Sequence, residues 1–331
     1  MAVEQCTPGF TSDLLVAEMS SLLDEKLLRV PNDSPLALAF PLVRPDSASI
    51  SYALQALEYG DRPSVQAEVW IPLPNERFDL VTDAEDLRER AKQKLWTPAD
   101  DMTSLELIRQ LEEGKYLHSI VGLLPGVTPW GTQAIRDTIS IDLDHDSTSP
   151  KNPIPPTTPV GMVRFAEHIA RIPIAKTTGR IAILGYGPLV GEPLASQVLP
   201  INGVDMDRVT LFKTRDAIES SYERLAAGEF RWVFSAYPAA AKITRLAPGT
   251  VMIDAGYAIG ADGKACGNAH PDLLKQSIRS HDTAPDFSNG IVVTAFRRGT
   301  GPVTIAEVFD RGADYQLQEN RMLGDIALSY N

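Results

Sequence analysis

Apolar residues in the first half of the chain recur alternately with helical and with extended spacing. Ser47 and Gly60 bracket one such segment, and serine caps helix starts while glycine commonly follows helix ends. The pattern predicts helices at 11–30, 47–60, 83–96 and 103–115, and strands at 35–43, 64–74 and 119–125. This β-α-β alternation predicts an α/β fold with a mostly parallel sheet.

The second half continues the alternation. The pattern predicts a helix at 157–172, strands at 180–184, 208–213, 231–236, 250–256 and 291–296, and a last helix from 302 onward. Between the halves, residues 143–160 are rich in Pro, Ser, Thr and Asp and lack apolar periodicity. Such a segment is typical of a passage between domains, so we expect one domain over 1–157 and a second over 158–310.

Composition and charge narrow the class of protein. The 331 residues are 44% hydrophobic, which is ordinary for a globular protein with two domains. The net charge of −12 repels a phosphate backbone, so we expect no nucleic-acid partner. Apolar runs are too short to span a bilayer, and no secretory signal is visible. Cys6 and Cys266 are too few for a disulfide framework, which favours a soluble, cytoplasmic protein.

The segment RIAILGYGPLVGEPLASQVL carries the strongest functional signal. An apolar strand runs into Gly185, Gly187 and Gly191, and a helix is predicted to follow. Glycine permits a sharp turn and a close approach to a pyrophosphate, while the helix N-terminus offers free N–H groups. The spacing is one residue longer than the commonest fingerprint, and a plain strand-turn-helix junction is the alternative. We expect a nicotinamide dinucleotide at this turn, and therefore hydride transfer.

Basic residues follow the second strand of this half, at Lys213 and Arg215, with Thr214 between them. In dinucleotide-binding folds an acidic residue here binds a free ribose 2′-hydroxyl, whereas basic residues accommodate a 2′-phosphate. The pair therefore favours NADP over NAD. A solvated basic turn explains the same residues, so both interpretations stay open.

Several segments together resemble the methylenetetrahydrofolate dehydrogenase/cyclohydrolase family, and they occur in that family's order across residues 119–310. They are DLDHDSTSPKN, PTTPVG, GYGPLVGEPLA, GTVMIDAGY and TAFRRGTGPVTIA. The resemblance implies a folate-site domain, a C-terminal Rossmann domain, and a helix over 311–331 that returns to the first domain. It also implies a cleft between the domains, and a homodimer.

The resemblance also implies site residues, with Tyr52 and Asp146 catalytic and no metal. For a folate or related substrate they are Tyr52, Leu123, Asp146, Arg297, Arg298, Gly299 and Pro302. For the nucleotide they are Thr158, Gly185, Tyr186, Gly187, Leu189, Val190, Gly191, Lys213, Thr214, Arg215, Ala236, Gly256 and Thr294.

The chain departs from the family at residues that carry its chemistry. The catalytic Lys that follows the family's Tyr is Ala56, and the family's Gln is Leu123. An Arg-Ser pair has become Tyr186-Gly187, and a Pro-Gly pair has become Arg297-Arg298. Oxidising a methylene bridge between two nitrogens mainly requires positioning and charge stabilisation. Water attack on the product cation also requires proton transfer, so we expect a dehydrogenase with weak or absent cyclohydrolase activity.

Other interpretations of these residues are open. Tyr52 could belong to the core, Asp146 could cap a loop, and Asp254 could be structural or functional. If Arg297 and Arg298 face a ligand, their donor forks suit a carboxylate or phosphate. The chain would then be an NAD(P)-dependent oxidoreductase of another anionic or imine-like substrate. A non-catalytic dinucleotide-binding protein is the third possibility.

Overall fold

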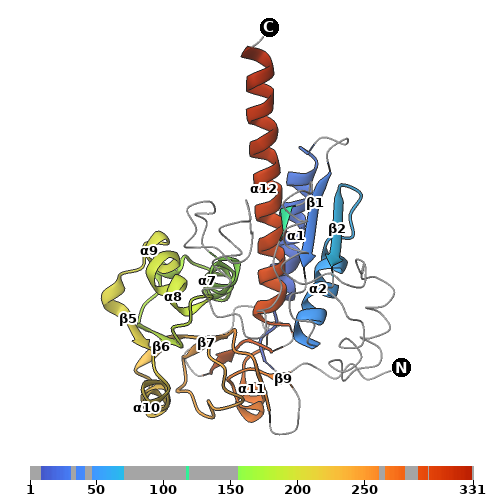
Figure 1. Ribbon diagram of the computed structural model, residues 1–331. Helices are drawn as coiled ribbons and strands as arrows, with labels where there is room; N and C mark the ends of the chain where they lie inside the picture. The colour runs from blue at the N-terminus through green and yellow to red at the C-terminus, as the bar shows by residue number, and fades with distance from the viewer. Residues whose placement is uncertain are drawn as a thin grey trace. The chain divides into compact units, whose positions relative to one another are not determined.

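The computed structural model describes residues 9–30, 35–41, 47–70, 117–118, 156–260, 265–279, 290–296 and 298–329. Strands and helices alternate through these residues (Figure 1), and the prediction of an α/β fold with parallel sheets is confirmed. The predicted helices near 83–96 and 103–115 and the strand at 119–125 lie outside the described residues.

The chain divides into two compact units. Unit 1 contains residues 1–17 and 158–304, and unit 2 contains residues 18–157 and 305–331. Residues 1–17 therefore group apart from the rest of the predicted first domain, and residues 305–310 group with unit 2. Backbone pairing explains the first difference: the Phe10 N–H donates to Val293 O at 2.7 Å, and the Ala295 N–H donates to Phe10 O at 2.8 Å.

A parallel sheet forms the centre of unit 1. Among the described residues its order is β10-β7-β6-β4-β5, and every neighbouring pair is parallel. The strands are β4 (Arg180–Leu184), β5 (Val209–Phe212), β6 (Phe230–Ser235), β7 (Val251–Asp254) and β10 (Val292–Val293). All but the first residue of β4 and all of β7 are buried, as expected for a parallel sheet covered on both faces.

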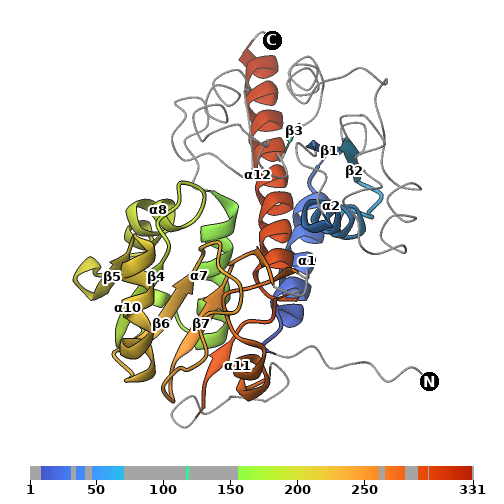
Figure 2. The ribbon, with the colours of Figure 1, turned by 60° about the horizontal axis from the view of Figure 1, so that its bottom comes forward.

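Helices cover this sheet on both sides in Figures 1 and 2, with α10 and α11 on one face and α7 on the other. Side chains of α10 and α11, including Ile218, Leu225 and Leu273, share one apolar cluster with alternate residues of the strands. The elements are α7 (Thr157–Ala170), η1 (Ile174–Lys176), α8 (Gly191–Pro193), the π-helical turn η2 (Leu194–Val198), α9 (Leu199–Ile201), η3 (Met206–Arg208), α10 (Arg215–Ala226) and α11 (Pro271–Gln276). A small antiparallel hairpin joins β8 (Ala258–Ile259) to β9 (Ala265–Cys266).

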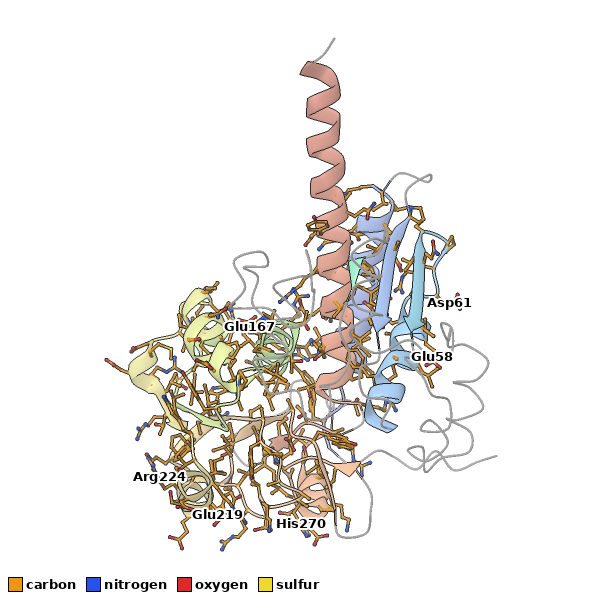
Figure 3. All side chains as sticks on the ribbon, in the orientation of Figure 1. Glu58, Asp61, Glu167, Glu219, Arg224 and His270 are labelled. Carbon is orange, nitrogen blue, oxygen red and sulfur yellow. The ribbon has the colours of Figure 1, made fainter. Side chains whose placement is uncertain are left out.

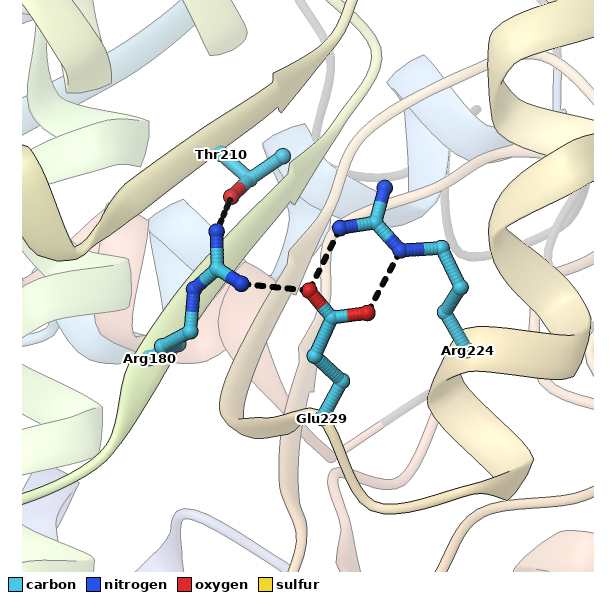
Figure 4. A network of polar contacts seen from close by, with 4 residues as sticks. All are labelled: Arg180, Thr210, Arg224 and Glu229. Atoms are coloured by element: carbon cyan, nitrogen blue, oxygen red, sulfur yellow. Dashed lines mark hydrogen bonds and ion pairs between the residues drawn. The ribbon is translucent and has the colours of Figure 1, made fainter.

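An ion-pair network ties the amino-terminal edge of this sheet to α10 (Figure 4). Glu229, just before β6, accepts a 2.6 Å hydrogen bond from Arg224 Nε and also pairs with Arg180 at the start of β4. The bonds from Arg224 lower the pKa of Glu229. Arg180 also donates to Thr210 on β5 at 3.1 Å, so the network joins neighbouring strands at the edge opposite the predicted glycine turn.

Unit 2 has its own parallel sheet and core. The described elements that lie wholly or mostly in this unit are α1 (Asp13–Leu27), β1 (Leu36–Pro41), α2 (Ser47–Tyr59), β2 (Val65–Trp70), β3 (Leu117–His118) and α12 (Thr300–Ser329), with sheet order β2-β1-β3. Leu23, Leu36, Phe40 and Phe309 are among its fully buried core residues. Lys26 of α1 forms an ion pair with Asp310 of α12. Burial alone would lower the pKa of the lysine, but its hydrogen bonds and its attraction to the acidic side chains of α12 together outweigh this effect, and the pKa is raised. No described helix is long and apolar enough to cross a membrane.

Candidate functional site

The strand order of unit 1 reverses between β4 and β6. β5 lies beside β4 on one side, and the chain then crosses to β6 on the other side. In parallel α/β sheets, ligands bind in the crevice outside the carboxyl ends of the strands at such a reversal. The turns that follow β4, β5 and β6 therefore define the candidate site.

Gly185 directly follows β4 and has a backbone conformation that favours glycine. Its φ is +96°, and a Cβ built there would lie 2.5 Å from the carbonyl oxygen of Ala236. Ala236 directly follows β6, and its N–H donates to Leu184 O at 2.9 Å. The glycine thus lets the exits of two neighbouring strands approach through their backbones.

The two later glycines of the motif have opposite surroundings. A Cβ at Gly191 would lie 2.0 Å from the carbonyl oxygen of Gly185, so a side chain there would collide with the turn. At Gly187 no atom beyond this residue and its two chain neighbours lies within 4 Å of the added Cβ. The first helical turn begins at Gly191, as predicted. The arrangement leaves space beside Gly187, where a phosphate could approach the backbone and the start of the helix.

A cavity of about 580 Å³ opens at these turns. Three consecutive strand exits and the first turns of α10 line it. The lining residues are Gly185, Tyr186, Gly187, Lys213, Arg215, Ile218, Glu219, Tyr222, Ala236, Tyr237, Pro238, Ala239 and Lys242. The structure therefore brings together six residues that were predicted from sequence as nucleotide contacts, namely Gly185, Tyr186, Gly187, Lys213, Arg215 and Ala236.

Cations from two of the turns face this cavity. The Lys213 ammonium lies 4.1 Å from the centre of the Tyr186 ring, within the range of a cation–π contact. Arg215 is 85% exposed and pairs at 3.0 Å with Glu219, which is labelled on α10 in Figure 3. The hydrogen bond that Arg215 donates to Glu219 raises the pKa of Arg215. Lys242 adds a positive charge from the loop after β6.

A pair of tyrosines forms part of the cavity wall. The hydroxyl oxygens of Tyr222 on α10 and Tyr237 after β6 are 3.0 Å apart, which is hydrogen-bond distance. Burial raises the pKa of Tyr237, so its hydroxyl stays protonated at physiological pH. With Ile218 and Pro238 beside them, these rings give the cavity an apolar side next to its cationic side.

Other predicted nucleotide contacts lie outside the cavity lining. Thr158 belongs to α7, and Leu189 and Val190 are half-buried in the turn before α8. Thr214 caps α10, because its hydroxyl accepts a hydrogen bond from the Ala217 N–H at 3.3 Å. Thr294 is buried, and its hydroxyl accepts from the Asp254 N–H at 2.8 Å.

Asp254, at the end of β7, holds neighbouring backbone segments together through hydrogen bonds. Its buried carboxylate accepts the backbone N–H groups of Gly256 at 2.9 Å, Asn268 at 2.7 Å and Ala269 at 3.0 Å. Burial raises the pKa of Asp254 to about 6, although these three hydrogen bonds favour the ionised form. Its carbonyl oxygen accepts from the Thr300 hydroxyl at 3.0 Å, so this residue links β7 to the start of α12.

The structure describes only part of the predicted substrate site. Leu123, Asp146 and Arg297 lie outside the described residues. Arg298 is held by Asp13: its Nε is 3.0 Å from Oδ1 and its Nη2 is 2.6 Å from Oδ2. This guanidinium therefore already has a carboxylate partner within unit 1.

Two further residues of the predicted substrate site, Gly299 and Pro302, follow Arg298 in the chain. Tyr52 and Ala56, where the family has its tyrosine and catalytic lysine, lie on α2. A Cβ at Gly299 would lie 2.0 Å from Ala295 O, and Pro302 lies in the first turn of α12. Tyr52 of α2 is partly buried and packs against the core of unit 2, while Ala56 is fully buried within that core. The position of the family's lysine thus holds a buried methyl group.

Apart from Arg215 and Ala236, the cavity residues of α10 and of the loop after β6 were not predicted from the sequence. A weak helical signal existed, since Ile218, Tyr222 and Leu225 recur at helical spacing after the Thr214 cap. Tyr237 and Pro238 directly follow an apolar strand, and in parallel sheets such positions lie at the binding edge. Lys242 had no local signal.

Comparisons with known proteins point in one direction. No family model matches the chain. The chain is 26% identical over 222 residues to the bifunctional protein FolD of Listeria monocytogenes serovar 1/2a, covering 61% of this chain and 66% of that protein. It is 27% identical over 226 residues to the bifunctional protein FolD of Chlamydia pneumoniae, covering 63% and 73%. The chain thus spans slightly less than two thirds of the Listeria relative.

Solved structures share the fold over almost the whole chain. A methylenetetrahydrofolate dehydrogenase-cyclohydrolase of Trypanosoma brucei, complexed with NADP and an inhibitor, has a TM-score of 0.64 at 16% identity, covering 95% of this chain and 98% of its own. The bifunctional enzyme of Thermoplasma acidophilum has a TM-score of 0.63 at 17% identity, covering 93% and 98%. The NAD-dependent dehydrogenase of Saccharomyces cerevisiae has a TM-score of 0.58 at 14% identity, covering 96% and 99%.

The parallel sheets and the glycine turn at the strand-order reversal define a two-domain α/β protein with a Rossmann-type unit. Within that class, the similarity in sequence to the bifunctional FolD proteins supports a divergent member of the methylenetetrahydrofolate dehydrogenase/cyclohydrolase family, and the solved structures share its fold. The resemblance found in the sequence is confirmed at this level.

Proposed function

We propose that the protein is a methylenetetrahydrofolate dehydrogenase that uses NADP and has weak or absent cyclohydrolase activity. The observation that carries the proposal is the cavity at the carboxyl edge of β4, β5 and β6, where Gly187 leaves open space and Lys213 and Arg215 supply positive charge. A nicotinamide nucleotide bound there would accept the hydride. Tyr52 and Asp146, together with a homodimer and a cytoplasmic location, remain predictions from the sequence.

The residues of the cavity fit the parts of such a nucleotide. The glycine turn offers backbone close to a pyrophosphate, and Gly191 lets the following helix approach that turn. The tyrosines and Ile218 provide an apolar surface of the kind that accepts an aromatic base. These residues would bind and orient the nucleotide. Orientation is the main requirement of a hydride transfer that needs little proton movement.

Ala56 supports the loss of the hydrolytic step. A methyl group can neither give nor accept a proton under these conditions, and this one is fully buried in the core of unit 2. General acid–base help typically contributes roughly 10²–10⁴-fold to rate. Its absence at this position would slow water attack and ring opening far more than hydride transfer, which separates the two activities of the family.

An absorbance assay of the purified protein with methylenetetrahydrofolate and either NADP or NAD tests this function. We expect reduced nicotinamide to form with NADP, accompanied by accumulation of the methenyl product because its hydrolysis is slow. Hydrolysis of the methenyl product as fast as it forms would contradict the proposed loss of cyclohydrolase. Nucleotide binding without turnover of the folate would favour another substrate for the same scaffold.

Cofactor choice follows from the charges at the end of β5. Replacing Lys213 and Arg215 together with alanine is expected to weaken NADP binding by roughly 10- to 100-fold, because a phosphate loses charged hydrogen-bond partners. NAD lacks that phosphate, so its affinity should change by less than about threefold. Titration with NADPH and NADH, followed by nicotinamide fluorescence, measures both effects. Lys275→Ala, on α11 outside the cavity lining, serves as the matched control.

A further inference from the structure

Asn268 is a buried side chain behind the cavity wall, and its amide is fully engaged. The Oδ1 atom accepts from the Ser235 hydroxyl at 2.7 Å and from the Tyr237 N–H at 3.5 Å. The Nδ2 atom donates to Tyr237 O at 2.8 Å and to Ala239 O at 2.6 Å. A primary amide offers two donors and one doubly accepting oxygen, so these four contacts use its whole capacity.

The position of Asn268 is itself fixed from two sides. The Asp254 carboxylate accepts its backbone N–H at 2.7 Å. Glycine makes room for each side chain: a Cβ at Gly256 would lie 2.0 Å from Asn268 Oδ1, and a Cβ at Gly267 would lie 2.5 Å from Asp254 Oδ2. The amide therefore sits in a close-fitting space, where its hydrogen bonds place the oxygen toward Ser235 and the nitrogen toward the carbonyl groups of Tyr237 and Ala239.

The contacts of Asn268 reach the loop that follows β6. Tyr237 and Ala239, which receive its hydrogen bonds, both line the cavity. The loop continues through Ala241, whose φ of +48° is unusual for a residue other than glycine, to Lys242 in the cavity lining. Its backbone is bonded to the same segment, since the Ala241 N–H donates to Gly267 O at 2.9 Å.

We infer that Asn268 is a positioning residue for nucleotide binding, because its amide holds the Tyr237–Ala239 wall of the cavity in place. The inference rests on the proposed function, since it takes the cavity to be the nicotinamide nucleotide site. Asn268 does not line the cavity and so acts through the wall rather than by touching the ligand.

The chemistry of the amide makes the role specific. In Asn268→Asp the shape is kept, but an oxygen replaces the nitrogen that donates to the two carbonyl groups. The new carboxylate oxygen would then face the carbonyl oxygens of Tyr237 and Ala239, and the repulsion should push the Tyr237–Ala239 wall away from residue 268. In Asn268→Ala the wall carbonyls lose their donor without repulsion. Ser235→Ala is a matched control, because it removes a buried hydrogen bond to the same amide and leaves both wall bonds intact.

Titration with NADPH, together with thermal unfolding of each variant, tests the inference in the full-length protein. We expect Asn268→Ala and Asn268→Asp to weaken NADPH binding by roughly tenfold or more, and Ser235→Ala to stay within about threefold despite its loss of stability. In turnover, the KM for the nucleotide should rise while kcat changes little. A structural role alone would instead lower stability in all three variants and leave the KM for the nucleotide unchanged.

The outcomes separate this inference from the proposed function. A folded Asn268→Ala or Asn268→Asp protein that binds NADPH as tightly as the wild type overturns the inference alone. Wild-type protein that binds neither NADPH nor NADH overturns the proposed function, and the inference with it.

Discussion

Replacing Gly191 with alanine is expected to lower the free energy of unfolding by about 3 kcal/mol and to abolish measurable nucleotide binding. The added Cβ would lie 2.0 Å from Gly185 O and 2.8 Å from Gly185 C. Both atoms belong to the backbone, so no side-chain rotation relieves the overlap. The turn and the start of α8 must separate, and the space for a pyrophosphate changes shape.

Gly187→Ala is the matched control for this prediction. It adds the same methyl group to the same turn, at a position where the added Cβ meets no atom within 4 Å beyond its chain neighbours. The free energy of unfolding should therefore change by no more than about 0.5 kcal/mol. Denaturant unfolding followed by circular dichroism compares the two variants. Equal stability of Gly191→Ala and Gly187→Ala would contradict the packing argument. Nucleotide titration of Gly187→Ala then shows whether a ligand approaches the backbone there.

The second large effect depends on pH. The unfolding free energy of the wild type, relative to Asp254→Asn, is expected to fall by about 2 kcal/mol between about pH 4 and pH 7. Burial raises the pKa of Asp254 from 3.8 to about 6. Between these values the native carboxyl keeps a proton that the unfolded chain has released. The stabilisation is therefore complete below pH 3.8 and is lost as the pH rises through about 6.

Urea unfolding of both proteins at several pH values measures this difference. Subtracting the Asp254→Asn curve removes the contributions of other carboxyl groups, because the variant lacks this one titration. The variant should be less stable at every pH, since its amide nitrogen would face backbone N–H groups that now donate to a carboxylate. A stability difference that stays constant from acid to neutral pH would contradict the assignment.

The elements that could be predicted from sequence are those whose pattern of apolar, glycine and capping residues is clear within a short segment. The strands β4, β6 and β7 each contain at least three consecutive apolar residues, and the Gly185 turn combines a strand before it with a helix after it. The helix α10 was not predicted because its buried residues are Ile218, Ser221 and Leu225, of which only two are apolar, in an otherwise polar segment. It nevertheless provides one side of the cavity.

The parts of the site that could not be predicted depend on contacts between distant residues. Arg298 looked available for a ligand, but Asp13 lies 285 positions earlier and binds its guanidinium. The wall at Tyr237 is irregular backbone whose shape depends on Asn268, 31 positions later. Asp13 and Asn268 are far in sequence from the residues that they contact, so periodicity and motif spacing could not indicate either contact.

The reciprocal fit of Gly256 and Asn268 has an evolutionary consequence. One residue is small because the other is large, and they share a volume that cannot hold two side chains. A lineage that enlarges position 256 must first shrink position 268, and it thereby gives up the amide that shapes the loop after β6. Change in ligand preference along this route would begin behind the pocket, among residues that do not line it.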